Sequence, residues 1–246
     1  MNGIYIGIAL AMAAGMASAD EIKVISGGAA RSFVEPMARS FSGHEVKLDW
    51  QPMGKLVQSL AAGQPADMVI VTAEVLQQLE KEGRLAPRSG KPIARVGIGV
   101  AVRENAPSPD ISTPEAFKRA LLAAKSIVYI DPKTGTSGKH VAEILSRLGI
   151  ADEVNRKATL AQGGYIVEPV GRGEIELGIH QISEILPVKG VKLVGELPRE
   201  LQKYTVYVAA PVSSSGKISL VNDFIRHLGG PQARERLAQA GYTSPE

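Results

Sequence analysis

The sequence predicts an α/β protein made of two lobes. Short apolar segments typical of strands alternate with amphipathic segments typical of helices along most of the chain. The alternation forms two blocks, the second starting near residue 95, and two longer strand patterns, at 95–103 and 204–210, connect them. Two lobes joined by two strands predict a hinge and a cleft that closes on a ligand.

The composition excludes several classes of site. The chain has 246 residues, enough for two small cores, and contains no cysteine, which rules out disulfides, thiol nucleophiles and thiolate metal sites. Its four histidines lack the spacing of metal ligands, so no metal or cofactor is expected. The net charge is +3, with Lys and Arg scattered along the chain. This pattern favours a small acidic ligand and predicts no nucleic acid partner.

The first residues predict export. An apolar run from Ile4 to Ala14 precedes an A-x-A pattern, which together are typical of a secretory signal peptide over residues 1–19. The run is too short to span a bilayer, and no later segment is long and apolar enough to do so. We therefore expect a periplasmic protein that is not stably inserted in a membrane, and a monomer.

The first block and the end of the chain predict lobe 1, over residues 20–94 and 206–246. The order β-α-β-α-β-α predicts a mostly parallel sheet with helices on both faces, and glycines end several of the helices. The expected strands cover 21–25, 45–50, 67–72 and 204–210, and the expected helices cover 30–41, 55–62, 73–82, 217–228 and 231–240.

The middle of the chain predicts lobe 2, over residues 95–205. One helix start is well marked, because Ser112 and Thr113 can cap it and Pro114 and Glu115 suit its first turn. The expected strands cover 95–103, 126–130, 176–180 and 191–197, and the expected helices cover 114–124, 139–148 and 165–171.

The loop after the strand at 126–130 predicts an anion site. A strand that ends in small residues and leads into a helix leaves backbone N–H groups unpaired, and the helix dipole adds positive charge at the same place. Capping of the helix by hydroxyl groups is compatible with anion binding. The candidate ligand contacts in this loop are Thr136, Ser137, Gly138, Lys139 and His140.

Three further turns are expected to face the same cleft, because each lies between a strand and a helix start at the edge where α/β folds bind ligands. His180, at the end of a strand, is expected to be a core histidine instead. The candidate contacts in these turns are Ser26, Gly27, Gly28, Arg31, Lys55, Gly164 and Tyr165.

Several segments together resemble the periplasmic molybdate-binding protein family, within the type 2 solute-binding proteins that feed ABC importers. They are KVISGGAA (23–30), AAGQPADMVIV (61–71), the segment 131–149, GRGEIELGIH (171–180) and FIRHLGGPQARERLAQAGY (224–242). The resemblance covers nearly all of the mature chain. It implies a two-lobed type 2 periplasmic binding protein fold with a two-strand hinge, an oxyanion held by serine hydroxyls and helix amides, and an ABC permease as partner.

The sequence departs from that family at the residues that would hold molybdate. Ala29 and Met53 stand where the family has serines, and Gln181 stands where it has a tyrosine. A bare dianion needs a closed shell of donors, which Ala29 and Met53 cannot supply through their side chains. Arg31 and Lys55 suit carboxylates. We therefore include Met53 and Gln181 among the expected contacts, and expect an organic carboxylate as ligand in place of molybdate.

Two functions remain open. The first is an exported solute-binding protein that captures a small anion, an organic carboxylate, for ABC import. The second is an isomerase on the same scaffold, because the resembled family includes aconitate isomerase, which moves a double bond within a tricarboxylate. That allylic proton shift needs carboxylate clamps and a proton shuttle but no cofactor. His140 and Tyr165 are the candidate shuttles.

Overall fold

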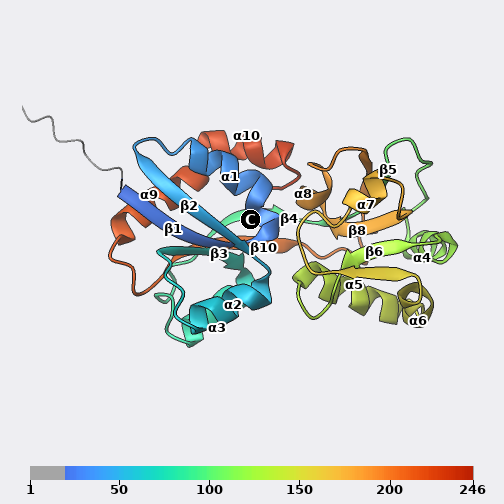
Figure 1. Ribbon diagram of the computed structural model, residues 1–246, viewed down its shortest axis with the longest axis horizontal. Coiled ribbons are helices and arrows are strands. Elements are labelled where there is room, and N and C mark those ends of the chain that lie inside the picture. Colours follow the sequence, from blue (N-terminus) through green and yellow to red (C-terminus); the bar gives the residue numbers. More distant parts are fainter. Residues whose placement is uncertain (1–19, 246) are drawn as a thin grey trace, which may run out of the picture.

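The computed structural model describes residues 20–245, so the expected signal peptide lies outside the described residues. Figure 1 shows two α/β lobes side by side, each with a five-stranded sheet. The strands of the first sheet are β1 (Asp20–Gly27), β2 (His44–Gln51), β3 (Met68–Thr72), β4 (Lys91–Val96) and β10 (Thr205–Pro211). Those of the second are β5 (Ile98–Arg103), β6 (Ile127–Ile130), β7 (Ala158–Ala161), β8 (Leu177–Gln181) and β9 (Val191–Glu196).

The two sheets share one topology. Their strand orders are β2-β1-β3-β10-β4 and β7-β6-β8-β5-β9. Each is mostly parallel, as predicted, and each contains one strand, β10 or β5, that runs antiparallel to both of its neighbours. The two-lobed α/β fold predicted from the sequence is therefore confirmed.

Helices cover both faces of each sheet. In the first lobe they are η1 (Gly28–Ala30), α1 (Arg31–Arg39), α2 (Met53–Ala61), α3 (Ala73–Lys81), α9 (Ile218–Leu228) and α10 (Pro231–Gln239). In the second they are α4 (Pro114–Ala123), α5 (Thr136–Arg147), α6 (Ala151–Asn155), α7 (Glu168–Gly171) and α8 (Ile182–Ile185). Figure 1 shows α1 and α10 on one face of the first sheet and α2 and α3 on the other. Within residues 20–245, no helix has both the length and the apolar character needed to cross a membrane.

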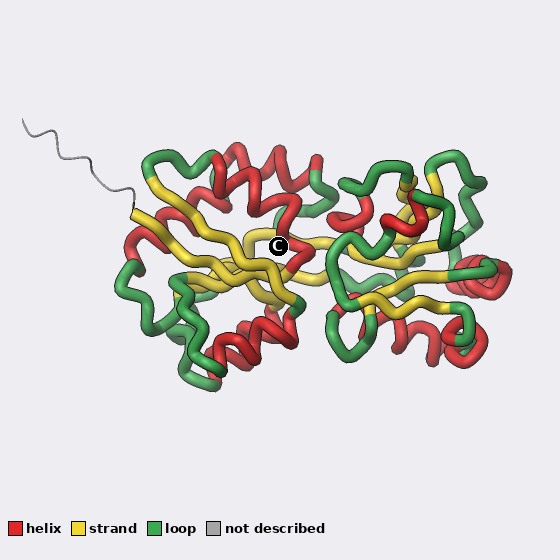
Figure 2. The backbone as a smooth tube through the Cα atoms, in the orientation of Figure 1, coloured by secondary structure: helices red, strands yellow, loops and turns green. Residues whose placement is uncertain are grey.

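The chain passes between the lobes twice, and the two crossings touch. The strand predicted at 95–103 is broken at Gly97, because β4 belongs to the first sheet and β5 to the second. The return crossing is the segment between β9 and β10, whereas the predicted strand at 204–210 lies in the first sheet. The side chain of Gln202, in the return crossing, accepts from the Ile98 amide (3.0 Å) and donates to the Ile98 carbonyl (2.8 Å). Figure 2 shows the paired crossings between the lobes.

Some elements differ from the prediction. Strands β4 and β7 and helices α6 and α8 were not expected, and most of them are too short for a clear hydrophobic period. The helix expected at 165–171 begins only at Glu168, after Gly163 and Gly164, whose φ values are positive. The helix expected from residue 139 begins at Thr136, one turn earlier.

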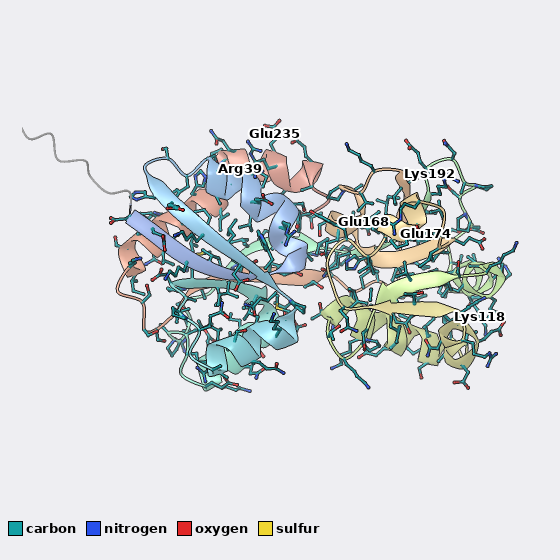
Figure 3. All side chains as sticks on the ribbon, viewed as in Figure 1. Arg39, Lys118, Glu168, Glu174, Lys192 and Glu235 are labelled. Atoms are coloured by element: carbon teal, nitrogen blue, oxygen red, sulfur yellow. The ribbon has the colours of Figure 1, made fainter. Side chains whose placement is uncertain are left out.

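Each lobe has its own hydrophobic core. Phe33, Leu56 and Phe224 are fully buried in the first, and Phe117 and Tyr129 in the second. Helix α8 follows a strand of the second sheet, yet its first residue, Ile182, packs in the core of the first lobe. Charged side chains lie outside these cores. Figure 3 shows Arg39 and Glu235 on the outside of the first lobe and Lys118 at the far end of the second.

Asp67, just before the central strand β3, accepts hydrogen bonds from β1 and from the segment before α9, and the shift of its pKa leads to a testable prediction. Burial raises this pKa, but the Lys23 amide (2.9 Å), the Ser215 hydroxyl (2.7 Å) and Lys217 outweigh it, so the net shift is downward. A lowered pKa stabilises the fold above the unfolded-state value of about 3.9, and this stabilisation is lost as the pH falls through the folded-state value.

We expect Asp67→Asn to lower the free energy of unfolding by about 1–2 kcal/mol at pH 7, because the charge-assisted hydrogen bonds weaken. The difference from wild type should shrink at pH 3, where the wild-type carboxylate is increasingly protonated. Urea unfolding at both pH values measures it. An equal loss at pH 7 and pH 3 would contradict the role of the charge.

Candidate functional site

A cavity of about 340 Å³ lies between the two lobes. It opens where the turns after β1, β2 and β6 meet the end of β8, so both lobes contribute to its walls. Its lining residues are Gly27, Gly28, Ala29, Arg31, Trp50, Gln51, Pro52, Met53, Ile130, Thr134, Gly135, Thr136, Ser137, Gln162, Gly163, Gly164, Tyr165, His180, Gln181, Glu184 and Tyr207.

Three helices begin at this cavity. The residues that precede α1, α2 and α5 are Ala30, Pro52 and Gly135, and none of them offers a side-chain acceptor to the first amides of its helix. In contrast, α3 begins with Thr72, whose hydroxyl accepts from the Val75 amide at 3.4 Å. The partial positive charge of three helix ends therefore converges on one space, which favours an anion.

The wall from the first lobe combines one cation with apolar surface. Arg31 begins α1, and its guanidinium lies over the ring of Trp50 at 5.2 Å. Met53 is 8% exposed and packs against the turn after β1. A Cβ at Gly27 would lie 1.9 Å from Met53 Cε, so a side chain there would force Met53 to move. Arg31 is the one Lys or Arg among the described residues that line the cavity.

The wall from the second lobe consists of two loops. Gly135, Thr136 and Ser137 form the start of α5, where the sequence predicted an anion site. The other loop carries Gly163 and Tyr165. A Cβ at Gly163 would lie 3.6 Å from Pro52 in the first lobe, so the two lobes approach closely here.

Tyr165 is influenced by charges of both signs. Burial raises the pKa of its phenol, the positive charge of Arg31 opposes this shift, and the negative charge of Glu184 adds to it. The hydroxyl group therefore remains protonated at neutral pH and is available as a hydrogen-bond donor.

The floor of the cavity holds a buried His–Glu pair. His180 Nε2 lies 2.9 Å from Glu184 Oε2 and 3.2 Å from the carbonyl oxygen of Gly164. The side chains of His180 and Glu184 are 2% and 8% exposed. A carbonyl oxygen can only accept, so Nε2 donates its hydrogen to Gly164, with Glu184 beside it at ion-pair distance. His180 Nδ1 is buried and has no hydrogen-bond partner among the described residues.

Gln181 and Tyr207 join the lobes next to this pair. Gln181 donates to Thr205 Oγ1 (3.0 Å) and accepts from the Tyr207 hydroxyl (3.1 Å). Both hydrogen bonds of its side-chain amide are therefore made with strand β10 of the first lobe. Burial raises the pKa of Tyr207 well above its ordinary value, and the charge of Glu184 adds to the shift. Tyr207 is thus a neutral donor in the cavity wall.

Nine of the sequence-predicted contacts line the cavity and five do not. The nine are Gly27, Gly28, Arg31, Met53, Thr136, Ser137, Gly164, Tyr165 and Gln181. Ser26 is fully buried and its hydroxyl donates to the Gly27 carbonyl at 3.2 Å. Lys55 and Lys139 are exposed outside the lining, and Gly138 packs against the backbone at the end of β6.

His140 is the most consequential correction. Its Nε2 lies 2.7 Å from the carbonyl oxygen of Leu201, and Nδ1 lies 3.7 Å from Glu143, so the ring is turned away from the cavity toward the return crossing. The structure therefore places this candidate shuttle outside the site, whereas the other candidate, Tyr165, lines it. Helical periodicity explains this, because successive residues of α5 point in different directions. Thr136 and Ser137 line the cavity, whereas Lys139 is exposed to solvent and His140 contacts the return crossing.

Sequence reasoning missed four lining residues that matter for the chemistry: Trp50, His180, Glu184 and Tyr207. His180 is buried, as expected of a core histidine, but it is buried at the cavity. Its partner Glu184 belongs to α8, a helix of four residues that was not predicted. The available signal was the i, i+4 spacing of a histidine and a glutamate across a strand end.

Comparisons with known proteins agree on the fold. The chain aligns with an aconitate isomerase from Pseudomonas sp at 31% identity, covering 89% of this chain and 86% of the relative. It aligns with the molybdate-binding protein ModA of Escherichia coli at 27% identity, covering 98% and 96%. The solved periplasmic molybdate-binding protein of Azotobacter vinelandii superposes with a TM-score of 0.77 at 18% identity, covering 92% of this chain and 100% of that one.

The sulfate-binding protein SubI of Mycobacterium tuberculosis H37Rv superposes with a TM-score of 0.76 at 17% identity, covering 92% of this chain and 88% of that one. At such identities these structures show a shared fold. A family model described as "bacterial extracellular solute-binding protein" matches residues 22–243. The chain therefore belongs to the family of bacterial extracellular solute-binding proteins.

Proposed function

We propose that this protein captures a small organic acid with two or three carboxylates in the cleft between its lobes. One observation carries the proposal. The cavity that gathers three helix N-termini and Arg31 also contains a buried carboxylate, Glu184, and the apolar side chains of Met53 and Trp50. A ligand must therefore offer both anionic groups for Arg31 and an apolar body.

A bare tetrahedral oxyanion suits this cavity poorly. Molybdate and sulfate have no apolar part that could pack against Met53 and Trp50. The thioether of Met53, where a hydroxyl donor would be needed, adds no compensating hydrogen bond.

Family membership supports a role in import. In this proposal the protein is periplasmic and monomeric, and delivers its ligand to an ABC permease. The lobes, residues 20–94 with 206–246 and residues 95–205, close on the ligand about the two crossings near Gly97 and Gln202. Closure would bring Arg31 and the start of α5 to the same anion from opposite sides.

A thermal-shift screen tests the ligand class. We expect tri- and dicarboxylates to raise the melting temperature, because a ligand at 100 times its Kd stabilises the folded state by about 2.7 kcal/mol. Molybdate, tungstate and sulfate at equal concentration are the controls and should shift it little. Stabilisation by micromolar molybdate with no response to carboxylates would overturn the proposal.

A second candidate function is isomerisation of an unsaturated tricarboxylate. Two observations favour it: the identity of 31% to an aconitate isomerase, and the presence of a buried ionisable pair in the cavity. Incubation with cis- or trans-aconitate, followed by chromatography of the product, tests it. Tight binding without any conversion would leave capture of the ligand as the only function.

A further inference from the structure

We infer that Glu184 is the group that takes the proton from the bound acid and that His180 positions it. This inference rests on the second candidate function, and it moves the proton shuttle from His140 to the floor of the cavity. Glu184 is the one Asp or Glu among the described residues that line the cavity, and all but 8% of its side chain is buried.

The two oxygens of Glu184 have different surroundings. Oε2 lies 2.9 Å from His180 Nε2, at the end of the second sheet. Oε1 points toward the turn after β1, since a Cβ added to Gly28 would lie 3.4 Å from it. This turn is where α1 and Arg31 begin, so Oε1 faces the space in which the anion would be held.

The backbone around Glu184 is fixed by both lobes. The neighbouring Ser183 hydroxyl donates to the carbonyl of Ala29 at 3.0 Å, and Ile182 packs in the core of the first lobe. Helix α8 is therefore held against the first lobe while His180, on β8, belongs to the second sheet. A carboxylate held in place by contacts with both lobes is preorganised for reaction with a substrate that both lobes contact.

A buried carboxylate in a site for anions repels the ligand and so weakens binding. Its presence is best explained by a role other than binding. Glu184 interacts electrostatically with the phenols of Tyr165, Tyr207 and Tyr242. The other charged groups that act on these phenols are Arg31, Glu35, Glu74 and Glu168. Burial raises the pKa of each of these phenols, so they donate hydrogen bonds and do not act as bases at neutral pH. The remaining nitrogen of the cavity, His180 Nδ1, is fully buried, so Glu184 is left as the base.

The step is a 1,3 proton shift. Glu184 takes a proton from the CH₂ group next to a carboxylate, and the electron pair of that C–H bond forms a new double bond to the central carbon. The electron pair of the original double bond moves to the far carbon, which receives the proton back from Glu184. No oxidant, reductant or leaving group is involved. The charge that builds up on the carboxylates during the shift faces Arg31 and the helix ends.

The pair with His180 gives Glu184 its geometry. His180 Nε2 lies 2.9 Å from Glu184 Oε2, and His180 Nδ1 has no hydrogen-bond partner among residues 20–245. His180→Gln keeps an N–H donor near the carboxylate, whereas His180→Phe removes it. If His180 positions Glu184, the Gln variant should retain more activity than the Phe variant, with the KM of both close to that of wild type.

The experiment follows trans-aconitate in D₂O by proton NMR, with binding measured in parallel by calorimetry. The wild-type protein should isomerise the substrate and incorporate deuterium from the solvent into it. Glu184→Gln should reduce both rates by about 100-fold or more, the usual contribution of a general base. Its affinity for trans-aconitate should be equal or higher, because a like charge has gone. Glu143→Gln, which alters an exposed carboxylate beside His140 and outside the cavity, is the matched control and should stay within about twofold of wild type.

The outcomes separate the two proposals. Wild-type protein that binds carboxylates but exchanges no deuterium overturns this inference and leaves the proposed binding function standing. Glu184→Gln protein that binds and still exchanges at the wild-type rate overturns the role of Glu184 while isomerisation stands. Wild-type protein that binds no carboxylate overturns the binding function, and this inference falls with it.

Discussion

Gly138→Ala should destabilise the second lobe by about 3 kcal/mol. A Cβ at this position would lie 2.0 Å from the carbonyl oxygen of Ile130, 2.7 Å from its carbonyl carbon and 3.0 Å from the carbonyl carbon of Asp131. These atoms belong to the backbone at the end of β6, so no side-chain rotation relieves the clash, and α5 must move. Alanine has the better helix propensity by about 1 kcal/mol, which is too little to compensate.

Gly54→Ala is the matched control. Gly54 lies in the first turn of α2, and a Cβ there would have nothing within 4 Å. We expect it to be neutral or to stabilise by about 0.5 kcal/mol. Urea unfolding of both variants, followed by circular dichroism, measures the difference. Equal stability of the two variants would show that α5 shifts at little cost, and would contradict the tight contact between α5 and β6.

Gly138 also shows what the sequence can and cannot predict about a site. The pattern of a strand, a loop of small residues and a helix predicted ligand contacts at Thr136 and Ser137, and both residues line the cavity. The same pattern assigned Gly138 and His140 to the ligand, because it contains no information on which side of the helix faces the cleft. That depends on how α5 packs on β6, a tertiary contact.

The fold was more predictable than the site for a physical reason. Hydrophobic periodicity within one segment predicted long elements such as α4 and α9, because the buried face of each is encoded locally. Helix α8 has only four residues, and its burial arises from contact with the other lobe. Glu184 and His180 are therefore brought into the cavity by long-range packing, which no local pattern indicates.

Arg31→Ala should weaken the binding of trans-aconitate by about 30- to 100-fold, whereas Lys55→Ala should change it by less than about twofold. Sequence position alone does not distinguish these two cations, since each lies in the first turn of a helix. The structure separates them: Arg31 lines the cavity over Trp50, and Lys55 is exposed outside the lining. A charge-assisted hydrogen bond in a partly desolvated site contributes about 2–3 kcal/mol to the binding free energy. The attraction of an exposed charge is weakened by water and salt.

Arg31→Lys refines the same test. Lysine keeps the positive charge but loses the planar fork that binds a carboxylate through two hydrogen bonds and stacks on an aromatic ring. We expect an affinity between those of wild type and Arg31→Ala. Calorimetry at about 0.15 M salt suppresses long-range attraction, so only a residue at the ligand should matter. If Lys55→Ala lost as much affinity as Arg31→Ala under these conditions, the anion would have to lie near the exposed face of α2, outside the cavity between the lobes.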